Sequence, residues 1–206
     1  MDSPGGMNLL LVPAPKTVKI AGVETPIHWD FRTGIRFELL MEQSLPEEEL
    51  LAKAMDLYFP PGAIPDEYLP EAVDRVLWFY TAGKEPEETG SGSGQGSAGA
   101  IYSYEYDDEY LYAAFLEQYG VDLNDGPPLH WWKFKAMFAS LRSDCRIVEI
   151  MGYRSMEISP KMSKEQQQFY RKMKRQFALP LPKSQREKLN AIEQALLHGG
   201  DLSKLL

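Results

Sequence analysis

Three histidines, His28, His130 and His198, are the side chains in this 206-residue chain best suited to acid–base chemistry. A histidine could act as a general base if a nucleophile or carboxylate stood beside it, but the sequence places no such partner next to His130. His130 follows a Pro-Pro turn and precedes two tryptophans, a setting typical of a structural residue at the start of a helix. We interpret it as structural.

A short acidic run made of Glu105, Asp107, Asp108 and Glu109 could hold a divalent cation through its carboxylate oxygens. The run lacks the alternating ligand positions and the central glycine of a calcium-binding loop. The alternative is that residues 107–109 form the first turn of a helix and interact favourably with its dipole. We favour this alternative, and the sequence therefore predicts no metal and no cofactor.

Cys145 is the only cysteine, which excludes a disulfide framework and a cysteine-based zinc finger. Arg142 and Arg146 could activate its thiolate at a helix N-terminus. No histidine is tied to it by the sequence, and we interpret it as a half-buried structural thiol. The sequence also has no phosphate-binding loop, dinucleotide fingerprint, nucleophile elbow or His-Glu-x-x-His motif. These observations predict a protein that is not an enzyme.

The composition, with 44% apolar and 25% charged residues, is typical of a folded globular protein. A net charge of −8 argues against a nucleic-acid-binding protein that uses its whole surface. The apolar run at residues 9–12, like every other apolar run in the chain, is far shorter than the ~20 residues of a membrane span. No basic residue precedes Leu9, unlike in a secretory signal. We expect a soluble cytosolic protein with one domain, or one domain and a satellite.

The hydrophobic pattern predicts a mainly α fold, a compact multi-helix domain with a small N-terminal β-hairpin and a helical C-terminal arm. The hairpin is expected to have strands over 17–20 and 25–29, with a turn at 21–23. The expected helices cover residues 30–43, 44–59, 66–82, 107–119, 129–141, 145–153, 163–177 and 183–197.

Helix boundaries follow from capping residues. Asp30 and Ser44 are the expected caps of the first two helices, and Gly120 is the expected C-terminal cap of the helix over 107–119. Gly34 lies inside the first helix at a cost of about 1 kcal/mol relative to Ala. The buried stripe of the helix over 66–82 is expected to consist of Val73, Val76, Leu77 and Tyr80.

The clearest division of the chain is an acidic and then glycine- and serine-rich stretch, in which five of the eleven residues 89–99 are glycine. Such a segment cannot offset its ordering entropy by burial. We divide the chain into a hairpin with helices (1–84), a flexible loop (85–101) and a C-terminal helical part (102–206) that shares one core with the first part. The loop is either a hinge or a variable surface loop.

Aromatic residues are concentrated after this loop, where six of the eleven tyrosines fall between residues 102 and 119. Tyrosine combines a large contact area with a polar tip and is common at protein interfaces. The alternative is a wide, partly wet core surface. The aromatic candidates for a protein-interaction surface are Tyr102, Tyr104, Tyr106, Tyr110, Tyr112 and Trp132.

Charge is also uneven, because residues 161–188 contain nine basic residues and two glutamates, which leaves −15 for the rest of the chain. This basic arm could pair head to tail with another copy, dock on an acidic partner or touch nucleic acid. A narrow apolar stripe favours a protein groove, and the alternative is a solvated helix packed on its own domain. The candidate interaction residues of the arm are Phe169, Arg171, Lys172, Lys174 and Arg175.

Five blocks of the sequence resemble the bacteriophage "gene product fifteen" family. They are residues 110–123, 129–135 and 150–155, with Trp29-Asp30-Phe31-Arg32 and Trp78-Phe79-Tyr80 before them. The resemblance covers roughly residues 25–180. It implies a small protein encoded in the tail-morphogenesis region of tailed phages and prophages of Gram-positive bacteria.

By gene position, members of this family resemble tail-assembly chaperones that coat the hydrophobic tape-measure protein before the tail tube polymerises. The resemblance supplies no catalytic residues. It implies a non-enzymatic protein of the host cytoplasm that binds the tape-measure or tail-tube proteins, with possible homo-oligomers and without membrane or nucleic acid as partner. The alternatives are a structural tail component retained in the virion and, second, a small hydrolytic or metal-dependent enzyme.

Overall fold

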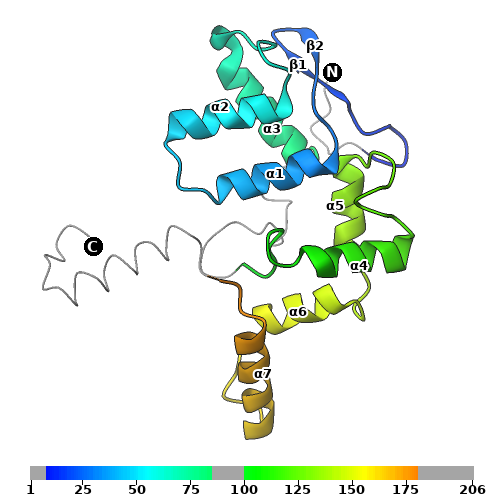
Figure 1. Cartoon of the computed structure of the whole chain (residues 1–206), viewed down its shortest axis with the longest axis vertical. Helices are drawn as coiled ribbons and strands as arrows, with labels where there is room; N and C mark the ends of the chain where they lie inside the picture. The colour runs from blue at the N-terminus through cyan, green and yellow to red at the C-terminus, as the bar shows by residue number, and fades with distance from the viewer. Residues whose placement is uncertain (1–7, 85–99, 181–206) are drawn as a thin grey trace, which may run out of the picture.

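A computed structural model describes residues 8–84 and 100–180, and it is mainly α, as the sequence predicts (Figure 1). Its strands are β1 (Thr17–Ile20) and β2 (Val23–Pro26). Its helices are α1 (Phe31–Met41), α2 (Glu47–Tyr58), the short 3-10 helix η1 (Asp66–Tyr68), α3 (Leu69–Tyr80), α4 (Asp108–Tyr119), α5 (Trp131–Ala139), α6 (Arg146–Ser155) and α7 (Lys164–Gln176). The predicted helix over 183–197 and the segment 85–99 lie outside the described residues.

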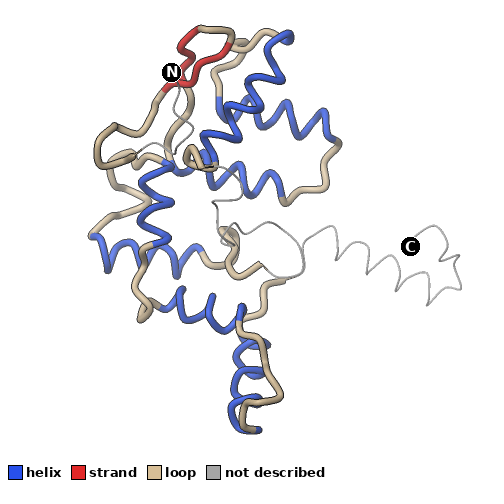
Figure 2. Tube along the Cα trace, turned by 180° about the vertical axis from the view of Figure 1, so that it is seen from behind, coloured by secondary structure: helices blue, strands red, loops and turns tan. Residues whose placement is uncertain are grey.

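The elements follow one another along the long axis of the molecule. The hairpin and α1–α3 occupy one end, α4 and α5 lie in the middle, and α6 lies beyond α4 (Figures 1 and 2). Helix α7 extends past α6 at the opposite end from the hairpin (Figures 1 and 2). The chain therefore has a helical arm that projects from its body.

The hairpin turn has two residues, Ala21 and Gly22, with φ angles of 50° and 80°. Two-residue turns with positive φ at both positions match the twist of the flanking strands. The second strand therefore begins at Val23, opposite Ile20, and ends at Pro26, which has no N–H with which to continue a ladder. The predicted longer turn and later second strand are wrong for this reason.

The hairpin is supported by α3. Val18 and Ile20 of β1 are buried, β1 packs on α3, and the N–H of Ala21 donates to Glu71 Oε2 at 2.9 Å. A lone two-stranded hairpin is only marginally stable in water. The contacts with α3 supply the burial that it lacks.

Local capping explains several helix starts and fails for one. The carboxylate of Asp30 accepts the N–H of Arg32 at 3.0 Å and caps α1, as predicted. Pro46, not the predicted Ser44, occupies the N-cap position of α2 and makes no side-chain cap. Three glutamates, residues 47–49, stand instead in the first turn of α2, where their charges interact favourably with the helix dipole.

In the part of the chain after segment 85–99, the helices begin and end near the predicted positions. Ser163 and Gln166 form a reciprocal capping box at the start of α7. Gly120 has a φ of 63° and ends α4, as predicted. His130 and Cys145 are the N-cap residues of α5 and α6.

The predicted helix over 66–82 divides into η1 and α3, because Pro70 is suited to the first turn of a new helix. The buried residues of α3 are Ala72, Val76 and Phe79, at i, i+4 and i+7. The predicted stripe was wrong at Leu77, which is 47% exposed. The helix is rotated so that Phe79 packs near Trp132, with ring centroids 5.9 Å apart.

One aromatic core joins the elements on both sides of segment 85–99. The ring of Phe134 in α5 stacks on Phe31 of α1 and on Phe115 of α4, with centroids 4.9 Å apart in each pair. The indole N–H groups of Trp131 and Trp132 donate to backbone carbonyls at the end of α3, at 2.9 and 2.6 Å. Helix α5 is thus the central element of the core.

Gly34 has a packing role inside α1 that offsets its low helix propensity. A Cβ atom at this position would overlap the indole of Trp131. Glycine allows α1 and α5 to approach closely at this point. By contrast, a Cβ on Gly152 of α6 would meet nothing within 4 Å.

These two glycines should respond in opposite directions to the same substitution. Gly34→Ala should lower the free energy of unfolding by about 1–3 kcal/mol, because overpacking against Trp131 outweighs the gain in helix propensity. Gly152→Ala, the matched control, should raise it by up to about 1 kcal/mol. Urea unfolding of both variants measures the two changes, and equal responses would contradict this account of Gly34.

Candidate functional site

The structure divides the predicted interaction residues into a buried and an exposed set. Tyr102, Tyr104 and Trp132 are only 6%, 8% and 1% exposed. The ring of Tyr102 packs edge-on against Phe138, with centroids 4.9 Å apart, and Trp132 is held by its bond to the end of α3. The prediction that these three side chains form an exposed surface is corrected: they are core residues.

The other three tyrosines lie on or just before α4 and are exposed. Tyr106, Tyr110 and Tyr112 are 42%, 38% and 36% exposed. The hydroxyl of Tyr112 donates to Asp122 Oδ2 at 3.2 Å. The backbone N–H groups of residues 125 and 124 bind the same carboxylate and lower the pKa of Asp122. These tyrosines thus border an acidic surface.

A groove of about 470 Å³ lies between α1 and α4. Its lining is mostly apolar, with acidic residues from the first turn of α4. Two predicted interaction residues, Tyr104 and Tyr112, contribute to it, whereas the sequence names none of its aliphatic or phenylalanine members as an interaction residue. The lining residues are Phe31, Ile35, Tyr104, Asp108, Glu109, Leu111, Tyr112, Leu123, Asn124 and Phe134.

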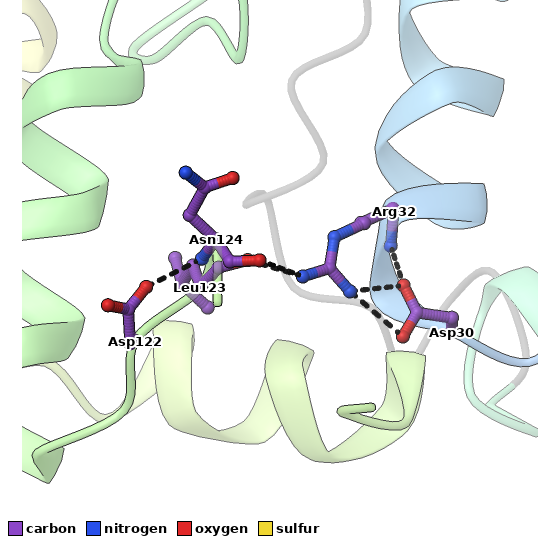
Figure 3. Close-up of polar contacts among 5 residues, drawn as sticks. All are labelled: Asp30, Arg32, Asp122, Leu123 and Asn124. Carbon is purple, nitrogen blue, oxygen red and sulfur yellow. Dashed lines mark hydrogen bonds and ion pairs between the residues drawn. The ribbon is translucent and has the colours of Figure 1, made fainter. Parts of the chain in front are cut away.

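Arg32 fixes one side of this α1–α4 groove. Figure 3 shows its guanidinium between Asp30, at the start of α1, and the turn at 122–124. Arg32 Nη2 donates to the carbonyls of Leu123 and Asn124 at 2.7 and 3.1 Å, and Nη1 donates to both oxygens of Asp30 at 3.2 and 3.3 Å. The turn that ends the groove is thereby tied to α1.

A buried ion pair fixes the start of α4. Arg154 of α6 binds Asp107 through two bonds, at 2.5 and 2.9 Å, and Asp107 also accepts the N–H of Ser103 at 2.9 Å. Arg154 donates further to the carbonyls of Ile101 and Phe177. Asp107 is therefore not free to bind a metal ion. Within residues 8–84 and 100–180, no three His, Cys, Asp or Glu side chains converge in a group that could hold a metal.

Helix α7 forms most of the described part of the basic arm, and its residues are exposed or half-buried. No α7 residue is buried, and Phe169 is 48% exposed. Arg171, Lys172 and Arg175 are exposed as well, whereas Lys174 is half-buried and donates to the carbonyl of residue 156 at 2.6 Å. The arm residues 183, 186 and 188 lie outside the described part of the chain. Helix α7 packs on α6 and presents its basic side to solvent.

The structure exposes one apolar segment to which sequence reasoning assigned no role, the leucine turn formed by residues 9–12. Leu10 and Leu11 are 93% and 80% exposed. The turn is ordered by Asn8, whose side chain accepts the N–H of Leu10 at 2.9 Å and whose carbonyl accepts that of Val12 at 2.9 Å. The uninterrupted apolar run in the sequence is the signal that could have identified it.

The leucine turn forms one wall of a surface pocket of about 560 Å³. Trp29 and Leu129 provide further apolar lining, and Lys16 and Lys133 add positive charge. The ammonium group of Lys16 lies 4.3 Å from the centre of the Trp29 ring. The pocket thus combines apolar walls with a basic rim.

His130 also lines this pocket, but both of its ring nitrogens are engaged. Nδ1 accepts the N–H of Trp132 at 3.0 Å, so Nε2 carries the proton and donates to the carbonyl of Pro15 at 2.8 Å. Burial lowers the pKa of His130 and favours its neutral form. This geometry fits the interpretation of His130 as a structural residue.

Cys145 is 4% exposed, so it is more deeply buried than the half-buried thiol that the sequence predicts. Its Sγ donates to Gln118 Oε1 at 3.6 Å. A thiol that is buried to this extent is shielded from reagents in the solvent. It has the surroundings of a structural residue.

Glu38 is a titratable group that sequence reasoning missed. Burial raises the pKa of Glu38 to about 7, although hydrogen bonding from Tyr80 and the positive charge of Lys135 favour the carboxylate. The Tyr80 hydroxyl donates to Glu38 Oε1 at 2.8 Å. The partners come from α3 and α5, so no local sequence pattern could identify this group.

Comparison with known proteins identifies one family. A family model described as bacteriophage Gp15 protein matches residues 12–179 of the chain. No curated protein and no solved structure gives a match. Among the described residues, no helix is both long and apolar enough to pass through a bilayer.

Removing the buried ion pair should destabilise the protein strongly. Arg154→Met leaves the Asp107 carboxylate buried without its partner and should lower the free energy of unfolding by about 3–5 kcal/mol. The control Lys53→Met breaks an exposed pair with Glu49 and should cost less than about 1 kcal/mol. Guanidinium unfolding measures both, and a loss at Arg154 no larger than that at Lys53 would refute the role of the pair.

Glu38 should make stability depend on pH. Its pKa is about 7 in the folded protein and ~4.3 in an unfolded chain, so the folded state holds the proton more tightly. Wild-type protein should therefore lose on the order of 2–3 kcal/mol as the pH rises from about 4.5 to about 7.

In Glu38→Gln this loss should disappear, because the amide stays neutral and can still accept a hydrogen bond from Tyr80. Urea unfolding at a series of pH values gives the difference between the two proteins. The opposite contribution of His130, whose lowered pKa reduces stability as the pH falls, is common to both and cancels. Parallel pH profiles for wild type and variant would contradict this assignment.

Proposed function

The chain belongs to the bacteriophage Gp15 protein family, and we propose that it is a non-enzymatic tail-assembly chaperone. In this proposal it works in the cytoplasm of the infected or lysogenic host cell. Its clients are other tail proteins, first of all the tape-measure protein and then the tail-tube protein. It binds them during tail assembly and transforms no substrate.

The exposure of the leucine turn is the observation that carries this proposal. Leu10 and Leu11 are 93% and 80% exposed beside a pocket with apolar walls. Contiguous exposed apolar surface on a folded protein is typical of a binding site for another macromolecule. Burial of one leucine side chain contributes about 1.5–3 kcal/mol, so a client segment that covers both leucines would gain several kcal/mol.

The chemistry of the pocket indicates what such a client segment looks like. Trp29 and Leu129 would receive apolar side chains, and Lys16 and Lys133 would attract acidic residues beside them. An amphipathic helix with an apolar stripe and acidic flanks meets both requirements. Each contact of this size is weak and reversible, and many copies on one long client would bind by avidity.

The surroundings of the reactive residue types support a role without catalysis. His130 uses both ring nitrogens in hydrogen bonds to the backbone. Asp107 is held by Arg154, and Cys145 is buried. Each of these side chains therefore has a structural task that accounts for its position.

Co-expression with the tape-measure protein tests the proposal. Wild-type protein should increase the soluble fraction of that partner severalfold, and Leu10→Ser with Leu11→Ser should lose most of this effect. The control Val23→Ser with Leu77→Ser removes two other exposed apolar side chains, which are 64% and 47% exposed, and should behave as wild type. Sedimentation of the lysate followed by quantification of the partner measures the outcome.

Two results would count against the proposal. A partner that stays insoluble with wild-type protein would refute the chaperone activity, and equal activity of the leucine variant would refute the leucine turn as its site. Mass spectrometry of purified phage particles is the companion measurement. A chaperone should be absent from them, and stoichiometric retention would identify a virion component instead.

A further inference from the structure

We propose that helix α7 of one copy docks in the α1–α4 groove of a second copy, so that copies of this protein associate head to tail. The proposal is independent of the function proposed above, because it concerns a different surface and requires no client. It rests on charge, on the shape of the groove and on the position of α7 in the molecule.

The two surfaces carry opposite charge. Residues 101–132 contain seven acidic residues and no lysine or arginine, and among them only Asp107 is paired with a buried arginine. Residues 161–180 contain six basic residues and one glutamate. Opposite fields of this kind steer two surfaces together and fix their register.

The groove offers a place for an apolar anchor between charges. Its lining includes Phe31, Ile35 and Leu111, and Asp108 and Glu109 stand beside them in the first turn of α4. Its volume of about 470 Å³ is within the ~300–1,000 Å³ of pockets that receive ligands. A helix with one aromatic side chain flanked by basic residues matches this pattern.

Helix α7 presents that combination at the edge of its solvent side, where Phe169 is 48% exposed while its ring also meets Tyr153 of α6 edge-on, with centroids 6.1 Å apart. Phe169, Lys172 and Arg175 are all exposed and follow one another at intervals of three residues, so they share one broad face. With a rise of about 1.5 Å per residue, Lys172 and Arg175 stand about 4.5 and 9 Å along the helix from the ring. Long basic side chains at these positions can reach acids beside a groove that holds the ring.

The position of α7 excludes this contact within one copy. Helix α6 lies between α4 and α7, and α7 extends away from α1 (Figures 1 and 2). The groove lies on the side of α4 that faces α1, whereas α6 packs against α4 from another side. The basic side of α7 can therefore meet an α1–α4 groove only in another molecule. Such a contact joins two different surfaces, and it produces rings or open chains.

Sedimentation velocity of the full-length protein, from micromolar to submillimolar concentration, tests the proposal. Wild-type protein should associate at ~0.05 M salt and dissociate at ~0.5 M salt, because screening weakens exposed charge pairs. The groove variant Asp108→Lys with Glu109→Lys, and the arm variant Lys172→Glu with Arg175→Glu, should each weaken association at least about tenfold. Phe169→Ala should weaken it without changing charge.

Mixing the two charge variants is the decisive measurement. Each retains one wild-type surface, so the equimolar mixture should regain association that neither variant shows alone. The control Lys53→Glu with Arg75→Glu changes the net charge as much as the arm variant does, but on α2 and α3, and should associate as wild type. Thermal unfolding checks that every variant is folded.

Several outcomes would overturn the proposal. The first is a wild-type protein that stays monomeric at low salt. The second is association that is as strong in both charge variants as in the wild type. The third is an equimolar mixture of the two variants that does not associate. A groove occupied by a segment of its own chain would give no dependence on concentration and would likewise refute it. None of these results bears on the solubility assay with the tape-measure protein, so the two proposals fail independently.

Discussion

The carbonyl oxygens at the C-terminal end of α3 form a central polar link between the two halves of the protein. The last carbonyls of an α-helix have no partner within the helix. Here α5 supplies three donors: Trp132 Nε1 binds the carbonyl of Phe79, and Trp131 Nε1 and Lys135 Nζ bind that of Tyr80. Because an indole N–H sits on a large apolar ring, the same contacts satisfy the backbone and fill the core. Separating α5 from α3 would remove both donors from the carbonyl of Tyr80, whereas that of Phe79 would keep the backbone N–H of Ala82. The close packing of α1 on the indole of Trp131 would be lost as well.

Two arginines then place α4 relative to this centre. Arg32 connects the start of α1 with the turn after α4, and Arg154 connects α6 with the residue that precedes α4. Both use several donors of one guanidinium, in part on backbone carbonyls, a geometry that lysine cannot reproduce. The groove between α1 and α4 owes its shape to these two side chains, although neither of them lines it. Residues that line the groove can therefore change while the contacts of Arg32 and Arg154 that position α4 are kept.

Sequence reasoning succeeded mainly where the determinants are local, although the Ser44 cap and the length of the hairpin turn were wrong. The caps formed by Asp30 and Gly120 and the mainly α class could be read from neighbouring residues. The burial of individual side chains could not be read in this way, because Tyr102 and Tyr106 have similar sequence surroundings and differ in what packs on them in the fold. Glu38 was missed for the same reason, since its partners lie on α3 and α5. The length of the apolar run at residues 9–12 argues against a membrane span, but its exposure is a property of the folded chain that the sequence does not display.

The burial of the single thiol makes this protein convenient for kinetic work. Cys145 is the buried N-cap residue of α6, and its Sγ is bonded to Gln118 of α4, so a thiol reagent can reach it only when the structure around it opens. With no second cysteine in the chain, the rate of labelling by an excess of reagent reports opening at this one position. The native protein therefore contains its own chemical reporter of opening at the start of α6, without any engineered label.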